Sequence, residues 1–351
     1  MSQHVDIPTP PGALPFVGHT FSLDPKAPVH SLVDLSRAHG PVFSLKFIGG
    51  SLTVVSSHAL VHELCDESRF DKKVTGALYN IRDIALDGLF TAHSTETNWQ
   101  KAHNILLPAF SMGAMANYFP RMLEVAEQLM ARWQSLNATD EIDVPDEMVR
   151  LTLDTIGLCG FDYRFNSFSR DEPHPFVESM LVALQESMDR AVRLPIATKL
   201  RFVKRQRYEE HVENLKSVVD RVIQERRASP AGDDAGDLLS LMLKGVDPES
   251  GEGLSDENIR YQIITFLIAG HETTSGLLSF ALYELIRHPA VLRRAYREVD
   301  AVLGSDLGAP PTLSQVGQLR YLRQILNEAL RLYPPAPAFT VMPLADTTLA
   351  G

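Results

Sequence analysis

A chain of 351 residues is long enough for two domains, although one large domain is also within range. Hydrophobic residues make up 44% of it and charged residues 22%, which is typical of globular proteins and excludes wholesale disorder. Acidic residues outnumber basic ones by 44 to 33. A nucleic-acid partner is therefore not expected, because binding to phosphates needs a concentrated positive surface.

The cysteine content and the N-terminus exclude further classes of protein. Two cysteines, Cys65 and Cys159, stand far apart, in no spacing typical of a metal site. A disulfide scaffold and a structural zinc site are thus excluded as main supports. No basic stretch followed by an apolar one begins the chain, so no secretory signal is predicted, and we expect a cytoplasmic protein.

The first part of the chain predicts a small β region. The segment 7–18 is rich in proline and glycine, and we expect it to lie extended over the surface. A short amphipathic helix is predicted over 32–39. The β-type runs 42–47 and 52–56, separated by a pair of glycines, predict a hairpin.

Most of the remaining chain has helical periodicity. Helices are predicted over 112–136, 147–159, 175–192 and 204–227. The polar stretches 229–237 and 247–253 are interpreted as loops within one helical domain, because neither is long enough to be a linker.

One helix is predicted to be much longer than the others. It begins after the capping residue Ser255, runs from Asp256 to Arg287 without a breaker, and would be about 48 Å long. Its middle is apolar on nearly all sides, which indicates burial. A membrane span is excluded, because Glu272 near its centre would cost about 2.5–3.5 kcal/mol in a bilayer. No membrane contact is expected.

The centre of this helix carries polar residues, which are unexpected in a buried segment. Two interpretations of them stay open. In the first, Thr273 bonds back to the carbonyl of Ala269, and Gly270 leaves room for a neighbouring helix. In the second, Gly270 lets a flat ligand approach, while Glu272 and Thr273 supply a carboxyl and a hydroxyl that handle protons. A zinc peptidase is excluded, because Ser275 stands where the second histidine of H-E-x-x-H belongs.

A charge pair precedes a proline-rich segment near the end of the chain. Glu328 and Arg331 stand three residues apart on a predicted helix and can therefore pair. Such pairs are mostly exposed and contribute little stability. The apolar segment 334–339 follows, and we interpret it as a stiff wall beside a cavity.

Trp99 and His103 stand four residues apart, so they lie one above the other on a predicted helix. They are either a core tryptophan with an incidental histidine or two N–H donors that face an anionic ligand group. An apolar loop with Leu89 and Phe90 comes before this helix and is expected to line the same cavity.

In combination, these segments resemble the cytochrome P450 family of heme-thiolate monooxygenases. The run A-G-H-E-T-T at 269–274 resembles the oxygen-activation signature of that family, and Glu328 with Arg331 matches its E-x-x-R pair. Trp99 with His103 is similar to its W-x-x-x-R/H motif, which faces the heme propionates. The likeness covers effectively the whole chain and is strongest to the heme domain of bacterial self-sufficient fatty-acid hydroxylases, where a flavin reductase follows.

The resemblance implies a cytochrome P450 fold, mainly α with a small β-hairpin or sheet region, in a single domain over 1–351. That domain is expected to be incomplete and to lack the reductase. The family's iron ligand is a cysteine in an F-x-x-G-x-R-x-C-x-G loop, and neither Cys65 nor Cys159 has this context. No metal ligand is therefore assigned in this chain, which we expect to be inactive by itself.

The resemblance also implies roles for individual residues. Thr273 and Glu272 would be catalytic, the first beside the reacting oxygen and the second in a proton relay. Heme b would contact Lys72, Trp99, His103, Ala269 and Gly270; Leu78, Phe90 and Ala336 would line the substrate pocket; Glu328 and Arg331 would be structural.

The implied activity is hydroxylation of C–H bonds in medium- or long-chain apolar or fatty-acid-like molecules. It would use O2 and electrons that come from NADPH through the FMN and FAD of a reductase, fused or separate. In the fatty-acid hydroxylases an Arg and a Tyr on the first hairpin hold the substrate carboxylate, and an ungapped match places Gly50 and Val55 there. We therefore expect a substrate that is apolar or that is anchored elsewhere. The alternative is a non-catalytic helical protein that has lost the iron ligand and either binds an apolar ligand or is a dead fragment.

Overall fold

The computed structural model describes residues 6–24, 27–48, 50–192, 202–228, 236–304 and 308–349. The chain divides into two compact units. The first unit comprises Met1–Asn80, Gln185–Phe202 and Pro337–Gly351, and the second comprises Ile81–Leu184 and Val203–Ala336. The single domain expected from the sequence stays a prediction.

The first unit holds the four strands that the structure describes. Its elements are α1 (Pro28–His39), β1 (Val42–Phe47), β2 (Gly50–Val55), α2 (His58–Leu64), β3 (Phe70–Lys72) and β4 (Val341–Pro343). The predicted hairpin is confirmed, since β1 pairs antiparallel with β2 from Val42 opposite Val55 to Phe47 opposite Gly50. Helix α1 begins at Pro28 and not at residue 32, because proline favours the first turn of a helix.

The second pair of strands was not predicted. Strand β3 pairs antiparallel with β4, which places Lys72 opposite Val341 although they lie far apart in the sequence. The proline-rich segment before α1 has an isolated bridge between Leu14 and Gly18. This segment is fixed to β1, because the fully buried His19 accepts the backbone N–H of Lys46 through Nδ1 at 2.9 Å.

The second unit is helical, as predicted. Its elements are α4 (Thr97–Leu106), η1 (Leu107–Phe110), α5 (Met112–Gln134), α6 (Val144–Phe161), η2 (Ser167–Ser169), α10 (Leu238–Lys244), α11 (Asp256–Arg287), α12 (Pro289–Leu303), α13 (Leu313–Val316) and α14 (Arg320–Leu332). Helices α3 (Gly76–Ala85), α7 (Pro175–Val192) and α9 (Phe202–Ala228) have residues in both units. The long predicted helices are confirmed, with ends that differ by at most three residues. Of the loop predicted over 229–237, residues 229–235 lie outside the described residues.

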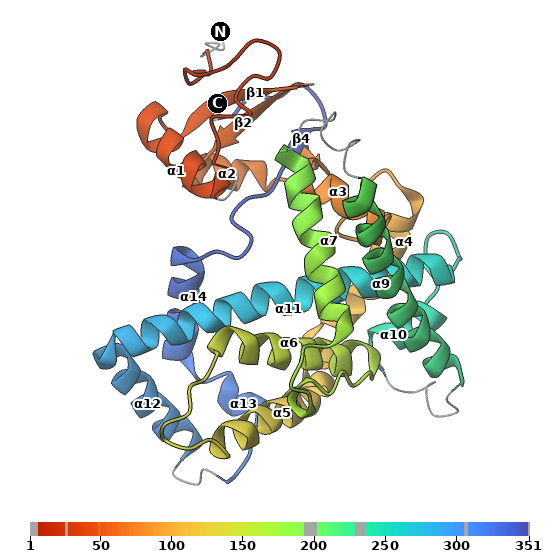
Figure 1. Cartoon of the computed structure of the whole chain (residues 1–351), viewed down its shortest axis with the longest axis vertical. Helices are drawn as coiled ribbons and strands as arrows, with labels where there is room; N and C mark the ends of the chain where they lie inside the picture. The colour runs from red at the N-terminus through yellow and green to blue at the C-terminus, as the bar shows by residue number, and fades with distance from the viewer. Residues whose placement is uncertain are drawn as a thin grey trace. The chain divides into compact units, whose positions relative to one another are not determined.

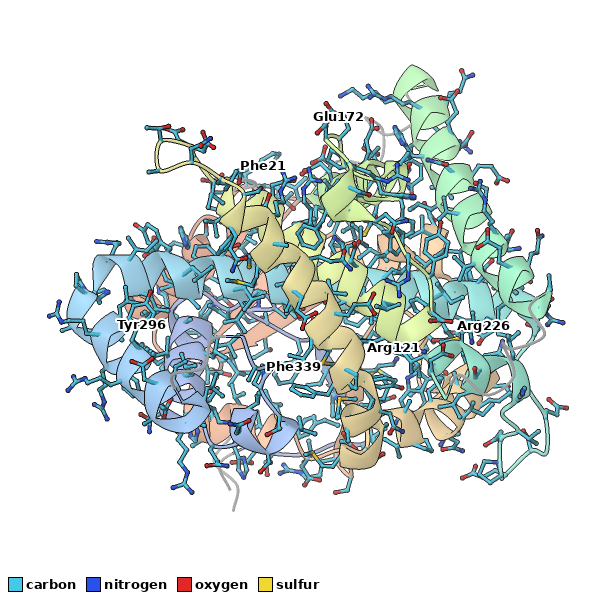
Figure 2. All side chains as sticks on the ribbon, turned by 90° about the horizontal axis from the view of Figure 1, so that it is seen from below. Phe21, Arg121, Glu172, Arg226, Tyr296 and Phe339 are labelled. Carbon is cyan, nitrogen blue, oxygen red and sulfur yellow. The ribbon has the colours of Figure 1, made fainter. Side chains whose placement is uncertain are left out.

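A single buried arginine joins three helices of the second unit. Arg226 of α9, labelled in Figure 2, makes two hydrogen bonds of 2.9 and 2.6 Å to the carboxylate of Asp237, the residue that caps α10. Its guanidinium also donates to the Ser240 hydroxyl at 2.9 Å and to the Phe161 carbonyl of α6 at 2.7 Å. These contacts fix α9, α10 and the end of α6 to one another.

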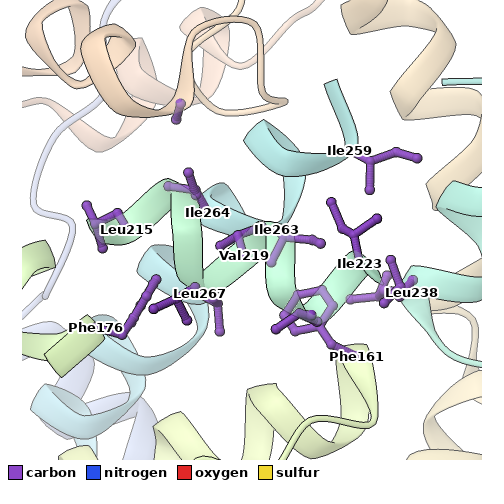
Figure 3. Packing of buried hydrophobic residues seen from close by; sticks show 14 of the residues in the cluster. Phe161, Phe176, Leu215, Val219, Ile223, Leu238, Ile259, Ile263, Ile264 and Leu267 are labelled. Carbon is purple, nitrogen blue, oxygen red and sulfur yellow. The ribbon is translucent and has the colours of Figure 1, made fainter. Parts of the chain in front are cut away.

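Helix α11 runs through the second unit with α6 alongside it (Figure 1). The Ser255 hydroxyl caps it by accepting the N–H of Asn258 at 3.2 Å, as predicted. Its N-terminal half carries Ile263 and Leu267 into the main hydrophobic cluster, beside residues of α9 and α6 (Figure 3). Among the helices that the structure describes, none is long and apolar enough to cross a membrane.

His174 makes the stability of the second unit depend on pH. Its Nδ1 accepts the N–H of Phe176 at 3.1 Å in the first turn of α7, and its ring lies edge-on to Phe165. Burial, and then the charges of Arg170 and Arg221, lower the pKa of His174 from 6.5 to about 4. The unfolded chain therefore takes up this proton at a higher pH than the folded chain does.

We expect stability to fall as the pH drops from about 6.5 towards about 4, with roughly 1–2 kcal/mol of the loss due to His174 after allowance for its partial exposure. Urea unfolding at pH 7 and at pH 4.5 measures this loss. His174→Asn can still accept the backbone N–H but does not titrate, so its loss should be smaller. Equal losses in the two proteins would contradict the assignment to His174.

Candidate functional site

The polar run at the centre of α11 has one exposed and one buried side. Ala269 and Thr273 are exposed one turn apart, Glu272 is half-buried and His271 is fully buried. The Thr273 hydroxyl donates to the Ala269 carbonyl at 2.8 Å, which confirms the predicted bond. A hydroxyl that donates in this way can still accept hydrogen bonds from a ligand or a water.

The buried side of the run packs on α6. A Cβ atom at Gly270 would lie 2.9 Å from Cγ1 of Ile156, and the Thr152 hydroxyl donates to the His271 carbonyl at 3.0 Å. Gly270 therefore leaves room for a neighbouring helix, as the first interpretation held. The groups of the second interpretation, Glu272 and Thr273, lie on the other side of the run, and their role in proton handling stays a prediction.

The side chains of His271 and Glu272 lie close to each other. Nδ1 of His271 donates to the Leu267 carbonyl at 2.8 Å, so the neutral ring carries its lone pair on Nε2. Within the described chain this Nε2 has no hydrogen-bond partner, and it lies 3.5 Å from Oε1 of Glu272. The site therefore places a carboxyl beside an imidazole nitrogen, one residue from Thr273.

Helix α4 carries the second predicted group. The rings of Trp99 and His103 are stacked, with centroids 5.2 Å apart and an interplanar angle of 17°. Nδ1 of His103 is buried, and no described residue hydrogen-bonds to it. An unsatisfied buried nitrogen suits a polar group of a ligand, because such atoms are seldom left unpaired.

The position of α4 depends on an ion pair that the sequence analysis missed. Arg82 of α3 makes hydrogen bonds of 2.8 and 2.7 Å to the Glu96 carboxylate and donates to the Thr91 carbonyl at 2.7 Å. Hydrogen bonding to Arg82 is the main cause of the lowered pKa of Glu96, which also accepts the N–H of His93. No spacing rule predicts an ion pair between an arginine of one helix and a residue in the loop before the next helix.

The structure also describes the other predicted residues. Lys72 of β3 and Leu78 of α3 belong to the first unit and are described only there. Ala336 is exposed after α14, and the whole segment 334–339 is exposed, so its packing gives no support to the interpretation as a cavity wall.

The pair of Glu328 and Arg331 is confirmed, with hydrogen bonds of 2.8 and 2.7 Å. Arg331 lowers the pKa of Glu328, and both side chains are exposed. Their structural role stays a prediction.

Neither cysteine suits an iron-bound thiolate. Burial raises the pKa of Cys159 to about 11, and its Sγ lies 3.8 Å from the Tyr118 carbonyl, so this side chain stays a protonated thiol. Cys65 is exposed at the end of α2 in the first unit. The exposed Ala269 and Thr273, by contrast, suit contact with a flat cofactor.

Comparison with known proteins shows which family the whole chain is similar to. The family model described as Cytochrome P450 matches residues 8–351. The chain is 51% identical over 352 residues to bifunctional cytochrome P450/NADPH–P450 reductase 1 of Bacillus subtilis. This alignment covers 100% of this chain and 33% of that protein. It is 54% identical over 321 residues to bifunctional cytochrome P450/NADPH–P450 reductase 2 of the same organism. This alignment covers 92% of this chain and 30% of that protein.

A fungal relative shows the same pattern of coverage. A self-sufficient cytochrome P450 monooxygenase of Phanerodontia chrysosporium is 44% identical over 343 residues, with 98% of this chain and 32% of that protein covered. The chain thus spans about a third of the length of the curated relatives it matches.

Proposed function

The chain belongs to the cytochrome P450 family, and we propose that it is the heme-binding part of a monooxygenase that hydroxylates medium- or long-chain apolar molecules. The observation that carries this proposal is the polar run of α11, where Ala269 and Thr273 are exposed beside Glu272. Heme b, when bound, supplies the redox chemistry that activates O2. The chain's own residues would bind the cofactor, hold water and move protons.

Each residue at this site has a task that its surroundings support. The Thr273 hydroxyl, held by its bond to the Ala269 carbonyl, would accept a hydrogen bond from a water beside it. The Glu272 carboxyl would exchange a proton with that water. The stacked Trp99 and His103 would donate to the heme propionates, and the unsatisfied Nδ1 of His103 supports this role.

The remaining assignments rest on the resemblance alone. Lys72 would reach a propionate, while Leu78, Phe90 and Ala336 would provide apolar lining for the substrate. Gly50 and Val55 carry no charge, which favours a substrate without a carboxylate anchor on the first hairpin.

We propose a flavin reductase as the electron donor. The Bacillus subtilis relatives combine a cytochrome P450 with an NADPH–P450 reductase in one protein, as their names state. Electrons from NADPH would then pass through FMN and FAD before they reach the heme.

Two measurements test the proposal. In a Trp133→Phe background Trp99 is the only tryptophan, and its fluorescence should be quenched by hemin up to about one hemin per chain. The longest protein that the gene encodes, supplied with NADPH and ¹⁸O2, should place one ¹⁸O atom in each hydroxylated product. Absence of quenching would contradict the cofactor assignment, and quenching without labelled product would favour a non-catalytic binder.

A further inference from the structure

We propose that the side chains of Asp87, Asn258 and Gln262 fix the loop that carries Phe90 on α11, and that they thereby determine which C–H bond of a chain-like substrate is oxidised. This loop, residues 86–91 between α3 and α4, is called the Phe90 loop below. The inference rests on the proposed function, because it concerns how the same site selects its C–H bond.

Two neighbouring polar residues of α11 bind the loop. Gln262 is fully buried, and its side-chain oxygen accepts the backbone N–H of Leu89 at 2.9 Å. Its amide nitrogen donates to Oδ1 of Asn258 at 3.1 Å, one turn earlier on the same face of the helix. Asn258 is also buried and donates in turn to Oδ1 of Asp87 at 2.9 Å.

Asp87 continues the network to the next helix. Its second carboxylate oxygen accepts the side-chain amide of Asn98, in α4, at 2.6 Å. The carboxylate therefore receives one amide donor from α11 and one from α4. Both of its oxygens are used, so the loop is fixed relative to two helices at once.

The loop backbone lies directly on α11. A Cβ atom at Gly88 would lie 2.3 Å from the hydroxyl of Thr265 and 2.9 Å from the carbonyl of Tyr261, so only glycine fits this approach. At the other end of the loop, the Thr91 hydroxyl donates to the carbonyls of Ala85 and Leu86, each at 3.0 Å.

Phe90 therefore lies between two tethered residues. Its own side chain is 54% exposed, so packing of the ring within the described chain does not fix its place. The hydrogen bonds of the Leu89 backbone N–H and the Thr91 hydroxyl fix the backbone on both sides of Phe90, and with it the point from which the ring extends. Because the position of this large ring depends on the backbone, the ring will move when the network changes. The ring is proposed to line the substrate pocket, so its movement will change which substrate carbon lies nearest to the reacting oxygen.

Asp87→Asn tests the inference with almost no change in volume. An asparagine at 87 brings its own NH2 group against one of the two amide donors, from Asn98 or Asn258, and loses that hydrogen bond. Asp220→Asn is the matched control. Asp220 binds Arg260 of α11 at 2.5 and 2.9 Å, so the control also weakens a carboxylate contact to α11.

The longest protein that the gene encodes is assayed with NADPH, a flavin reductase and a saturated C14 fatty alcohol. We expect Asp87→Asn to shift the ratio of hydroxylation positions by about 3- to 10-fold, the factor for the loss of one hydrogen bond, while Asp220→Asn leaves it unchanged. Deuterium exchange of the peptide covering residues 86–91 should become faster by a similar factor in Asp87→Asn, and should not change in Asp220→Asn. Asn98→Ala removes only the outer bond and should shift the ratio in the same direction if Asp87→Asn fails to fold.

The outcomes separate this inference from the proposed function. Faster exchange in the loop with an unchanged product ratio would overturn the inference and leave the monooxygenase assignment intact. Unchanged exchange in both Asp87→Asn and Asn98→Ala would overturn the role of the network. Absence of hydroxylated product from the unaltered protein would overturn the proposed function, and with it the selection of a C–H bond.

Discussion

Replacement of Asp237 by alanine is expected to lower the free energy of unfolding by about 3–5 kcal/mol, because it leaves a buried guanidinium without its counter-ion. Arg226 is 8% exposed and Asp237 is fully buried. The remaining contacts of Arg226, to a hydroxyl and a carbonyl, satisfy N–H groups but do not neutralise the charge. Loss of the α10 cap adds to the effect, since Asp237 also accepts the N–H of Ser240 at 2.9 Å.

Urea unfolding followed by circular dichroism measures this loss. The control is Glu124→Ala, which breaks the ion pair of Glu124 with Arg164. Both of these side chains are largely exposed, so we expect a change within about 1 kcal/mol. Similar small losses in the two variants would show that the buried pair does not hold α9, α10 and α6 together.

The helices could be predicted because their signals are local. Helix α11 begins and ends where predicted, since a capping serine and a following His-Pro pair mark its two ends. The start of α1 was predicted too late. Its first turn, from Pro28, contains polar residues, so the apolar periodicity used for the prediction does not reach it. Strand β4 was missed, since it is only three residues long and its partner lies far away in the sequence.

Separation in the sequence also decides which contacts of the site could be predicted. The bond from Thr273 to Ala269 joins residues four apart on a helix and was predicted, as was the placement of Trp99 and His103 one above the other. The bond from Leu89 to Gln262 joins residues 173 apart, for which no spacing rule exists. The residues to which we assign the chemistry were therefore visible in the sequence, whereas those that we propose position the Phe90 loop required the structure.

Gly270 shows a different limit. Its small size was compatible with a neighbouring helix and with a flat ligand, and the sequence left both possibilities open. Only the packing of Ile156 shows that α6 takes the space where a side chain would stand. A glycine in a motif thus indicates a close approach, but not which partner approaches.

Substitution of Thr273 by alanine is expected to leave the fold intact and to lower the yield of hydroxylated product per NADPH by about tenfold or more, on the scale of general acid–base effects. The side chain is exposed, and among the described residues it bonds only to its own helix, so its removal costs little stability. The proposed task of the hydroxyl is to hold a water beside Glu272. Without it, protons would reach the site less selectively, and reduced oxygen would leave as peroxide.

Two further variants make this prediction specific to the hydroxyl of Thr273. Thr273→Ser retains the hydroxyl and should retain most of the yield. Thr274→Ala removes the same groups from the next residue, which is also exposed on α11, and should have little effect. NADPH oxidation, peroxide and product are measured together, because the prediction concerns their ratio and not the overall rate. Equal yields in Thr273→Ala and Thr274→Ala would remove Thr273 from proton handling, since only its place beside Glu272 distinguishes the two threonines in this proposal.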